Sequence, residues 1–298
     1  MGEIVWGILL VAYLFVGGMA GGSYVVSALA DFFGKGKYRV LSKSGTYVSL
    51  ISILIGLVLL ILDLGRFTVD PLTSLNAYIN FPTSIMSVGT WVVTGFMAVS
   101  LLTSALWFFN GNSTIRKLLQ VAGLVLGGST MTYTGLLLSF SRIFWRTPYL
   151  PWLFIISGSL TGLVIALFMI PIIAVLMPRF FEEFKELFMN KKEFVALLST
   201  GQRYIVALII VELGLVGVEL TAGNVYAEYQ LAGLSAIFLI YIVFGLIVPL
   251  GIGYYIGKEP SMKNEKTAIM LSLVGFVLIL AGGFLLRYLT LITGQIIA

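Results

Sequence analysis

Eight apolar stretches, each long enough to cross a lipid bilayer, restrict the possible folds of this sequence more than any motif does. They cover approximately residues 4–30, 46–66, 84–109, 117–140, 152–177, 203–221, 231–256 and 267–293. A helix needs roughly 20 apolar residues to span a hydrocarbon core of about 30 Å. Of the 298 residues, 59% are hydrophobic and only 10% are charged, whereas soluble domains contain about 25% charged residues. The sequence therefore predicts an all-α integral membrane protein with eight transmembrane helices.

The spans leave no stretch long enough for a separate soluble domain. Residues 1–298 are accordingly predicted to form a single polytopic membrane domain. The longest connection, residues 178–203, has the charge pattern of an amphipathic surface helix.

A faint internal repeat divides the chain into two halves. An LF pair followed by small residues occurs in the first span (YLFVGGMAGGSY) and again in the fifth (PWLFIISGSLTG). The second and sixth spans both end near a carboxylate, in ILDLGRF and GVELTAG. Because an even number of helices restores the orientation of the chain, this pattern predicts two four-helix bundles related as a parallel repeat, approximately residues 1–145 and 146–298.

The basic residues collect in alternate connections between the predicted spans. Fourteen of them fall on one side of the membrane: Lys35, Lys37, Arg39, Lys43, Arg116, Lys117, Arg179, Lys185, Lys191, Lys192, Arg203, Lys258, Lys263 and Lys266. Arg66, Arg142 and Arg146 fall on the other side, and Arg287 lies inside the eighth span. Since cytoplasmic loops are enriched in Lys and Arg, we expect a multi-pass protein of the cell membrane with both termini on the non-cytoplasmic side.

The residue types that are absent exclude several kinds of site. The chain has no cysteine, so it cannot bind an iron–sulfur cluster through its own thiolates, and no histidine, so a bis-histidine haem and a Ser-His-Asp triad are excluded. The net charge of +5 does not indicate nucleic-acid binding, because the basic residues lie in short loops where membrane topology explains them.

Carboxylates near the ends of two spans are candidates for proton transfer. Asp63 and Arg66 are three residues apart, so they share one helix face, either as an interfacial ion pair or as part of a site. Glu212 and Glu219 are seven residues apart, which places them on one face about 10 Å apart in depth. They form either a ladder for protons or two carboxylates bonded to neighbouring side chains.

Other candidate residues also lie in the third of the membrane that is nearest the non-cytoplasmic surface. Tyr133 lies among small residues where its hydroxyl needs a buried partner, so a structural role and a ligand-binding role both remain open. Arg142 follows the same span, and Arg287 lies about twenty residues into the last one.

The glycines of the first span, Gly17, Gly18, Gly21 and Gly22, form a double GxxxG pattern. This pattern is typical of close helix packing, and it would alternatively leave room for a flat ring.

Several segments together resemble the NrfD / polysulfide reductase membrane-subunit family. They are VWGILLVAYLFVGGMAGGSY, LDLGRF, FPTSIMSVGTW, YTGLLLS, RIFWRTPYLPWLFIISG and GFLLRY, and they occur in the family's order along the whole chain. The resemblance implies a haem-free, eight-helix membrane subunit that reacts with quinone. It also implies a ferredoxin-like iron–sulfur partner and, through it, a catalytic subunit that often carries a molybdenum or tungsten bis-pterin.

The resemblance implies roles for the candidate residues. Tyr133 matches the family's YTG tyrosine and would bind a quinone oxygen, with a menaquinone-type carrier expected. The carboxylates of Asp63, Glu219 and Glu212 would transfer protons. The quinone pocket would further include Arg66, Arg142, Arg287, Gly18, Gly21 and Gly22. Some family members have a histidine near the quinone, and another donor must replace it in this chain.

The resemblance leaves open the direction of electron transfer and whether the chain is itself catalytic. The alternative function is a secondary transporter with intramembrane carboxylates, because parallel repeats and glycine-interrupted helices also occur in that class. A transporter would need its substrate site near the midplane of the membrane, whereas most polar candidates here lie near one surface.

Overall fold

The computed structural model describes residues 7–63, 76–79, 81–141, 148–222, 229, 233–258 and 264–296. In chain order its helices are α1 (Ile8–Phe33), α2 (Arg39–Asp63), α3 (Asn76–Ile79), α4 (Ile85–Phe108), α5 (Ser113–Ser141), α6 (Leu150–Leu176), α7 (Glu182–Met189), α8 (Lys191–Ala222), α10 (Ser235–Ile240), the π-helix η3 (Tyr241–Ile247), α11 (Val248–Lys258) and α12 (Glu265–Ile296). These residues contain no β-strand.

The prediction of eight membrane-spanning helices is confirmed by length and composition. The described residues form eight helices of sufficient length and hydropathy, and α10, η3 and α11 together make one of them, Ser235–Lys258. Helices are required because lipid offers no hydrogen-bond partner to an exposed backbone N–H or C=O.

The prediction for the connection 178–203 was wrong in extent. The surface helix α7 is only 8 residues long, and the next helix starts at Lys191 rather than near residue 203. Asn190 and Glu193 exchange hydrogen bonds at this start, as in a capping box. Phe194 is buried and packs against Phe188 of α7, so apolar contacts extend the spanning helix toward the membrane surface.

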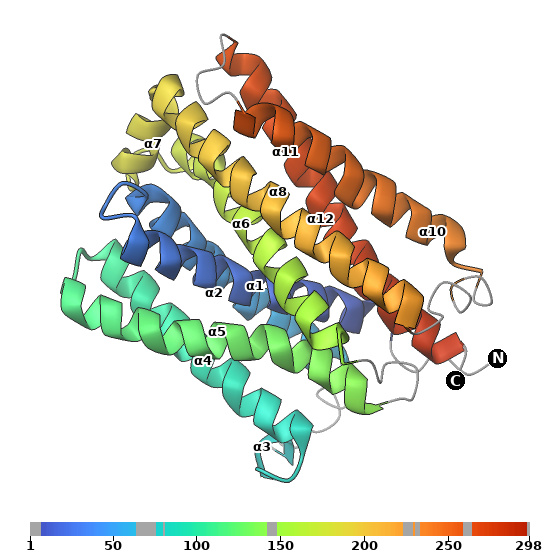
Figure 1. The fold of residues 1–298 in the computed structure, drawn as a ribbon. Coiled ribbons are helices and arrows are strands. Elements are labelled where there is room, and N and C mark those ends of the chain that lie inside the picture. The colour runs from blue at the N-terminus through green and yellow to red at the C-terminus, as the bar shows by residue number, and fades with distance from the viewer. Residues whose placement is uncertain are drawn as a thin grey trace.

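The helices form one bundle (Figure 1), and the ion pairs among the described residues lie near one of its two ends. One end, here called the basic end, contains the connections at residues 34–38, 109–112 and 177–190. The other, here called the termini end, contains the start of α1 and the end of α12. Whether the two halves of the chain repeat one another stays a prediction.

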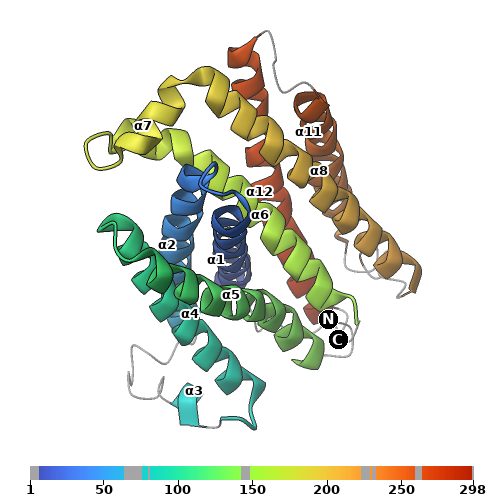
Figure 2. The same ribbon diagram turned by 60° about the vertical axis from the view of Figure 1, so that its left-hand side comes forward.

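Helix α1 lies in the middle of this bundle (Figure 2). It packs against α2 and α5 of the first half and against α6 and α12 of the second. Helices α2 and α5 also pack against α6, so the first span is one of three elements through which the two halves of the chain meet.

Glycines allow the backbones of α1 and α6 to approach closely. A Cβ added at Gly22 would overlap the carbonyl group of Gly158, and one added at Gly162 would overlap the backbone of α1 at Gly22 and Ser23. Gly21 meets Gly127 of α5 in the same way. The double GxxxG pattern thus serves close helix packing in this fold.

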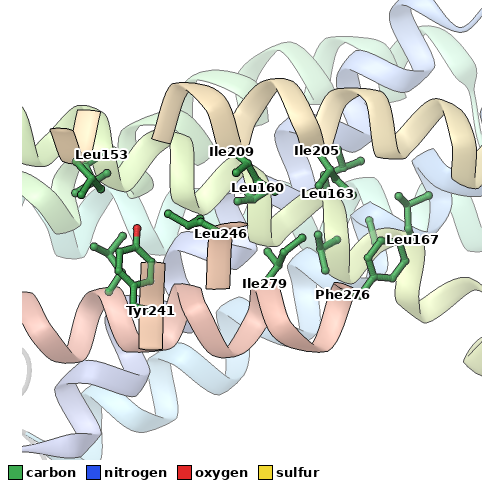
Figure 3. Packing of buried hydrophobic residues seen from close by; sticks show 14 of the residues in the cluster. Leu153, Leu160, Leu163, Leu167, Ile205, Ile209, Tyr241, Leu246, Phe276 and Ile279 are labelled. Carbon is green, nitrogen blue, oxygen red and sulfur yellow. The ribbon is translucent and has the colours of Figure 1, made fainter. Parts of the chain in front are cut away.

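The second half has its own apolar core between α6, α8, η3 and α12. Leucine and isoleucine side chains from the four helices interdigitate there, together with Tyr241 and Phe276 (Figure 3). Tyr241 is the polar member of this group, and its hydroxyl donates a hydrogen bond to Glu212 of α8.

We expect Gly22→Ala to destabilise the protein, because the new methyl group would overlap the carbonyl oxygen of Gly158. Overpacking of this kind costs about 1–3 kcal/mol. The thermal unfolding midpoint in detergent measures the effect.

Gly128→Ala is the matched control, since a Cβ at Gly128 meets nothing within 4 Å. Alanine is a better helix former than glycine by about 1 kcal/mol, so this variant should be as stable as the wild type or more so. Equal destabilisation by both substitutions would contradict the close crossing.

Candidate functional site

Four helices contribute to a buried polar cluster, which consists of Ser157 (α6), Glu212 (α8), Tyr241 (η3) and Arg287 (α12). Each of these residues is at most 1% exposed. The Tyr241 hydroxyl donates a hydrogen bond of 2.9 Å to Oε1 of Glu212. Nη1 of Arg287 donates to Oγ of Ser157 at 2.6 Å and to the carbonyl oxygen of Gly283 at 3.0 Å. Two oppositely charged side chains are thus buried within the same helix bundle.

The buried polar cluster has hydrogen-bonding capacity that the protein does not use. Nε and Nη2 of Arg287 and Oε2 of Glu212 are buried and have no hydrogen-bond partner. The two side chains attract each other electrostatically, yet none of the ion pairs among the described residues joins them directly. Unpaired buried polar atoms are costly, and in native proteins they often mark a functional site. The arrangement leaves two guanidinium nitrogens, with three N–H groups, and one carboxylate oxygen for a further polar group.

Two contacts position the guanidinium group of Arg287. Its Cζ lies 5.1 Å from the centre of the Phe154 ring, a distance at which a cation and an aromatic face attract each other. A Cβ at Gly18 would lie 3.2 Å from Nη2, so this glycine leaves the space into which the guanidinium extends. Gly18 of α1 is therefore a neighbour of the buried polar cluster, and a larger side chain there would crowd Arg287.

The members of this cluster lie at a common depth below the termini end. Arg287 and Glu212 lie nine and ten residues before the ends of their helices, and Ser157 and Tyr241 lie seven and six residues after the starts of theirs. At about 1.5 Å per residue, these positions are roughly 9–15 Å from the ends of the spans. Four separate helices thus bring polar groups to a similar depth, and Glu212 lies furthest from the end of its helix.

Tyr133 on α5 lies at a similar depth, eight residues before the end of its helix. Its ring lies directly over Gly89 of α4, where any Cβ would overlap the ring atoms. Tyr13 of α1 is close enough to Tyr133 for the two hydroxyls to interact electrostatically. Within the described part of the chain neither hydroxyl has a hydrogen-bond partner. Two neighbouring tyrosine hydroxyls are therefore available for a ligand.

The remaining predicted site residues are placed only in part. Glu219 is half-buried and lies about 10 Å nearer the end of α8 than Glu212 does. Asp63 is the last residue of α2, and its side chain lies outside the described part of the chain. Arg66 and Arg142 also lie outside the described residues. Their roles, like that of Tyr133, stay predictions.

Three residues of this region were not predicted from the sequence: Tyr13, Ser157 and Tyr241. Tyr13 and Tyr241 each interrupt a strongly apolar run, which is the signal that would have identified them. No comparable signal exists for Ser157, because Ser and Thr are common at helix contacts in membranes and its partner is 130 residues away in sequence.

A curated protein resembles the chain over nearly its full length. It is the "Hdr-like menaquinol oxidoreductase integral membrane subunit" of Archaeoglobus fulgidus, which is 25% identical over 313 aligned residues that cover 99% of this chain and 72% of the relative. A sequence model of the family described as "Polysulphide reductase, NrfD" matches residues 1–298. Since this match covers the entire chain, the protein belongs to the NrfD polysulphide reductase family.

Proposed function

We propose that this chain is the quinol-reactive membrane subunit of a respiratory oxidoreductase. It binds a menaquinone-type quinol below the termini end and exchanges electrons with an iron–sulfur subunit docked on that end. One observation carries the proposal. Polar side chains from six helices, α1, α5, α6, α8, η3 and α12, lie at a similar depth, and buried atoms of Arg287 and Glu212 among them have no hydrogen-bond partner. The name of the Archaeoglobus fulgidus relative, a menaquinol oxidoreductase subunit, supports the choice of carrier.

The chemistry of these residues fits a quinol head group. Oxidation of a quinol releases two electrons and two protons, so its site needs hydrogen-bond partners for two oxygens and a path for protons. The hydroxyls of Tyr13 and Tyr133 and the free N–H groups of Arg287 provide donors. Oε2 of Glu212 provides an acceptor for a proton.

Each residue then has a distinct task. Tyr133 hydrogen-bonds one quinone oxygen. Gly89 has no side chain and so leaves the space that the Tyr133 ring occupies. Arg287 stabilises negative charge, since its guanidinium remains protonated. Glu212 accepts a proton while Tyr241 orients its other oxygen.

Residues nearer the membrane surface complete the proposed site. Asp63 and Glu219 pass protons outward, and Arg66 and Arg142 contribute to the pocket or to docking of the partner subunit. Because the chain has no cysteine, thiolate-bound iron–sulfur clusters would belong to a partner subunit, and we place the bis-pterin in a further, catalytic subunit.

Tyr133→Phe should lower the rate of quinol oxidation by the assembled complex about tenfold. The substitution removes one hydrogen bond to the reacting oxygen, and about 1.4 kcal/mol corresponds to a factor of ten in rate. Turnover is measured with a soluble menaquinol analogue. Activity of the catalytic subunit with an artificial dye should not change, because the dye bypasses the membrane.

Tyr254→Phe serves as the matched control for this variant. Tyr254 is a 64% exposed tyrosine of α11, four residues from the helix end at the basic end. Normal quinol kinetics in Tyr133→Phe, or an equal defect in both variants, would contradict the role of Tyr133.

Gly89→Ala should reproduce the quinol defect without removing the hydroxyl, because the new Cβ would occupy the position of the Tyr133 ring. We expect a higher KM for quinol together with normal dye activity. Gly95→Ala on the same helix is the control, since its Cβ would make only ordinary contacts, at 3.7 and 3.8 Å, with Leu126. Unchanged quinol kinetics in Gly89→Ala would show that the position of the Tyr133 ring does not matter.

Glu212→Gln should slow quinol turnover and reduce the release of protons coupled to it. Glutamine keeps the shape of the side chain and an oxygen for the Tyr241 hydroxyl, but it cannot accept a proton. Acidification outside proteoliposomes during turnover measures the effect. Glu193→Gln, an exposed position at the other end of α8, should leave acidification unchanged. Wild-type coupling in Glu212→Gln would remove this residue from the proton path.

A further inference from the structure

A second feature, far from the termini end, is an apolar groove of about 440 Å³ on the membrane-facing side of the bundle. It lies between α2, α4 and α6 near the basic end. Helix α2 packs against both α4 and α6, and all three helices contribute lining residues. Apart from Tyr47 and Ser104, all of its lining residues are apolar.

The groove lies within the depth of one leaflet of a bilayer. On α4 its lining runs from Phe108 at the basic end to Leu101, seven residues or about 10 Å deeper, and on α6 it runs over the same length from Leu176 to Met169. Half of a hydrocarbon core is roughly 15 Å. Ile51, Leu101 and Leu176 are all more than half exposed, so the groove opens sideways toward lipid.

The size of the groove favours a single hydrocarbon chain over a protein helix. A helix with its side chains is about 10 Å across and would occupy roughly 800 Å³ over a length of about 10 Å. The groove offers about 440 Å³. At the basic end of the groove the rings of two lining residues, Phe108 and Phe181, lie 6.1 Å apart.

A cluster of charges with an excess of positive charge lies beside the basic end of the groove. Three cations surround the ring of Trp107: Arg116 at 3.7 Å, Lys43 at 5.6 Å and Arg39 at 5.8 Å from its centre. Among the described residues two carboxylates pair with them, Asp31 with Arg116 and Glu183 with the other two cations. The cluster therefore has one positive charge in excess.

Arg39 is the accessible member of this charge cluster. Its side chain is 50% exposed, whereas those of Lys43 and Arg116 are 9% and 13% exposed. Its Nη2 also donates a hydrogen bond of 3.4 Å to Asn110, the residue that follows the lining residue Phe109. The guanidinium thus lies at the head-group level, next to the groove.

We infer that this groove binds one anionic phospholipid from the leaflet at the basic end. One hydrocarbon chain occupies the groove, and the phosphate pairs with Arg39. Basic pockets between transmembrane helices are known to recognise anionic head groups, and each basic side chain near the surface contributes about 1 kcal/mol. The inference does not depend on the quinol site, which lies at the opposite end of the bundle.

Lipid binding to the purified complex tests the inference. After delipidation in detergent, phosphatidylglycerol or phosphatidylcholine with identical chains is added back, and the bound lipids are counted by native mass spectrometry. We expect one retained phosphatidylglycerol for each copy of this chain and weaker binding of phosphatidylcholine. Equal binding of the two lipids, or a quinone in place of the lipid, would overturn the assignment.

Substitutions separate the contribution of the groove from that of the charge. Ala105→Phe fills the groove and should abolish the bound lipid, whereas Val125→Phe, at a 65% exposed position on α5 outside the groove, should retain it. Arg39→Gln should weaken phosphatidylglycerol about fivefold, the equivalent of about 1 kcal/mol, and phosphatidylcholine less, because its choline cation offsets the charge of the phosphate.

A second filling variant guards against a folding defect. If Ala105→Phe fails to assemble, Ile51→Trp blocks the deep end of the groove from an exposed position. Wild-type lipid retention in an assembled groove-filling variant would refute the site. Quinol turnover should remain normal in these variants, so a failure here is distinguishable from a failure of the proposed quinol function.

Discussion

The close crossing of α1 and α6 is the constraint on which the rest of the structure depends. Because Gly22, Gly158 and Gly162 carry no side chains, the two backbones touch, and α1 can occupy the middle of the bundle. This position brings Gly18 beside Arg287 and Tyr13 beside Tyr133. A glycine contact with no chemistry of its own thus brings polar groups of both halves of the chain to α1.

The cost of burying charge in a membrane restricts where these polar side chains can lie. A charged side chain inside a membrane is tolerated when it faces the protein interior and has partners there. Arg287 meets this condition only in part, since Ser157 and Gly283 use one of its nitrogens and two remain without a hydrogen bond. A fully satisfied arginine would indicate a structural role, whereas the unused N–H groups at this depth favour a ligand with acceptor oxygens.

The sequence was sufficient to predict the fold class and the spans, because lipid imposes strict rules on composition and on backbone hydrogen bonding. Glu212 and Arg287 were identifiable for the same reason, as charges within apolar helices. The sequence could not show that they share a cluster with Ser157 and Tyr241, because that depends on the packing of four helices far apart in sequence. Nor could it distinguish Gly22, which is tightly packed, from Gly128, which is not.

The same packing bears on the alternative of a secondary transporter. Alternating access commonly requires one bundle to rock against the other around a central site. Here α1 of the first half and α6 of the second are in backbone contact through Gly22 and Gly158, and α1 also packs against α12. Rocking one half of the chain against the other would break this backbone contact between α1 and α6. A site that exchanges electrons needs no such motion, since the carrier can enter from the bilayer, so the close interface between the halves favours the redox function.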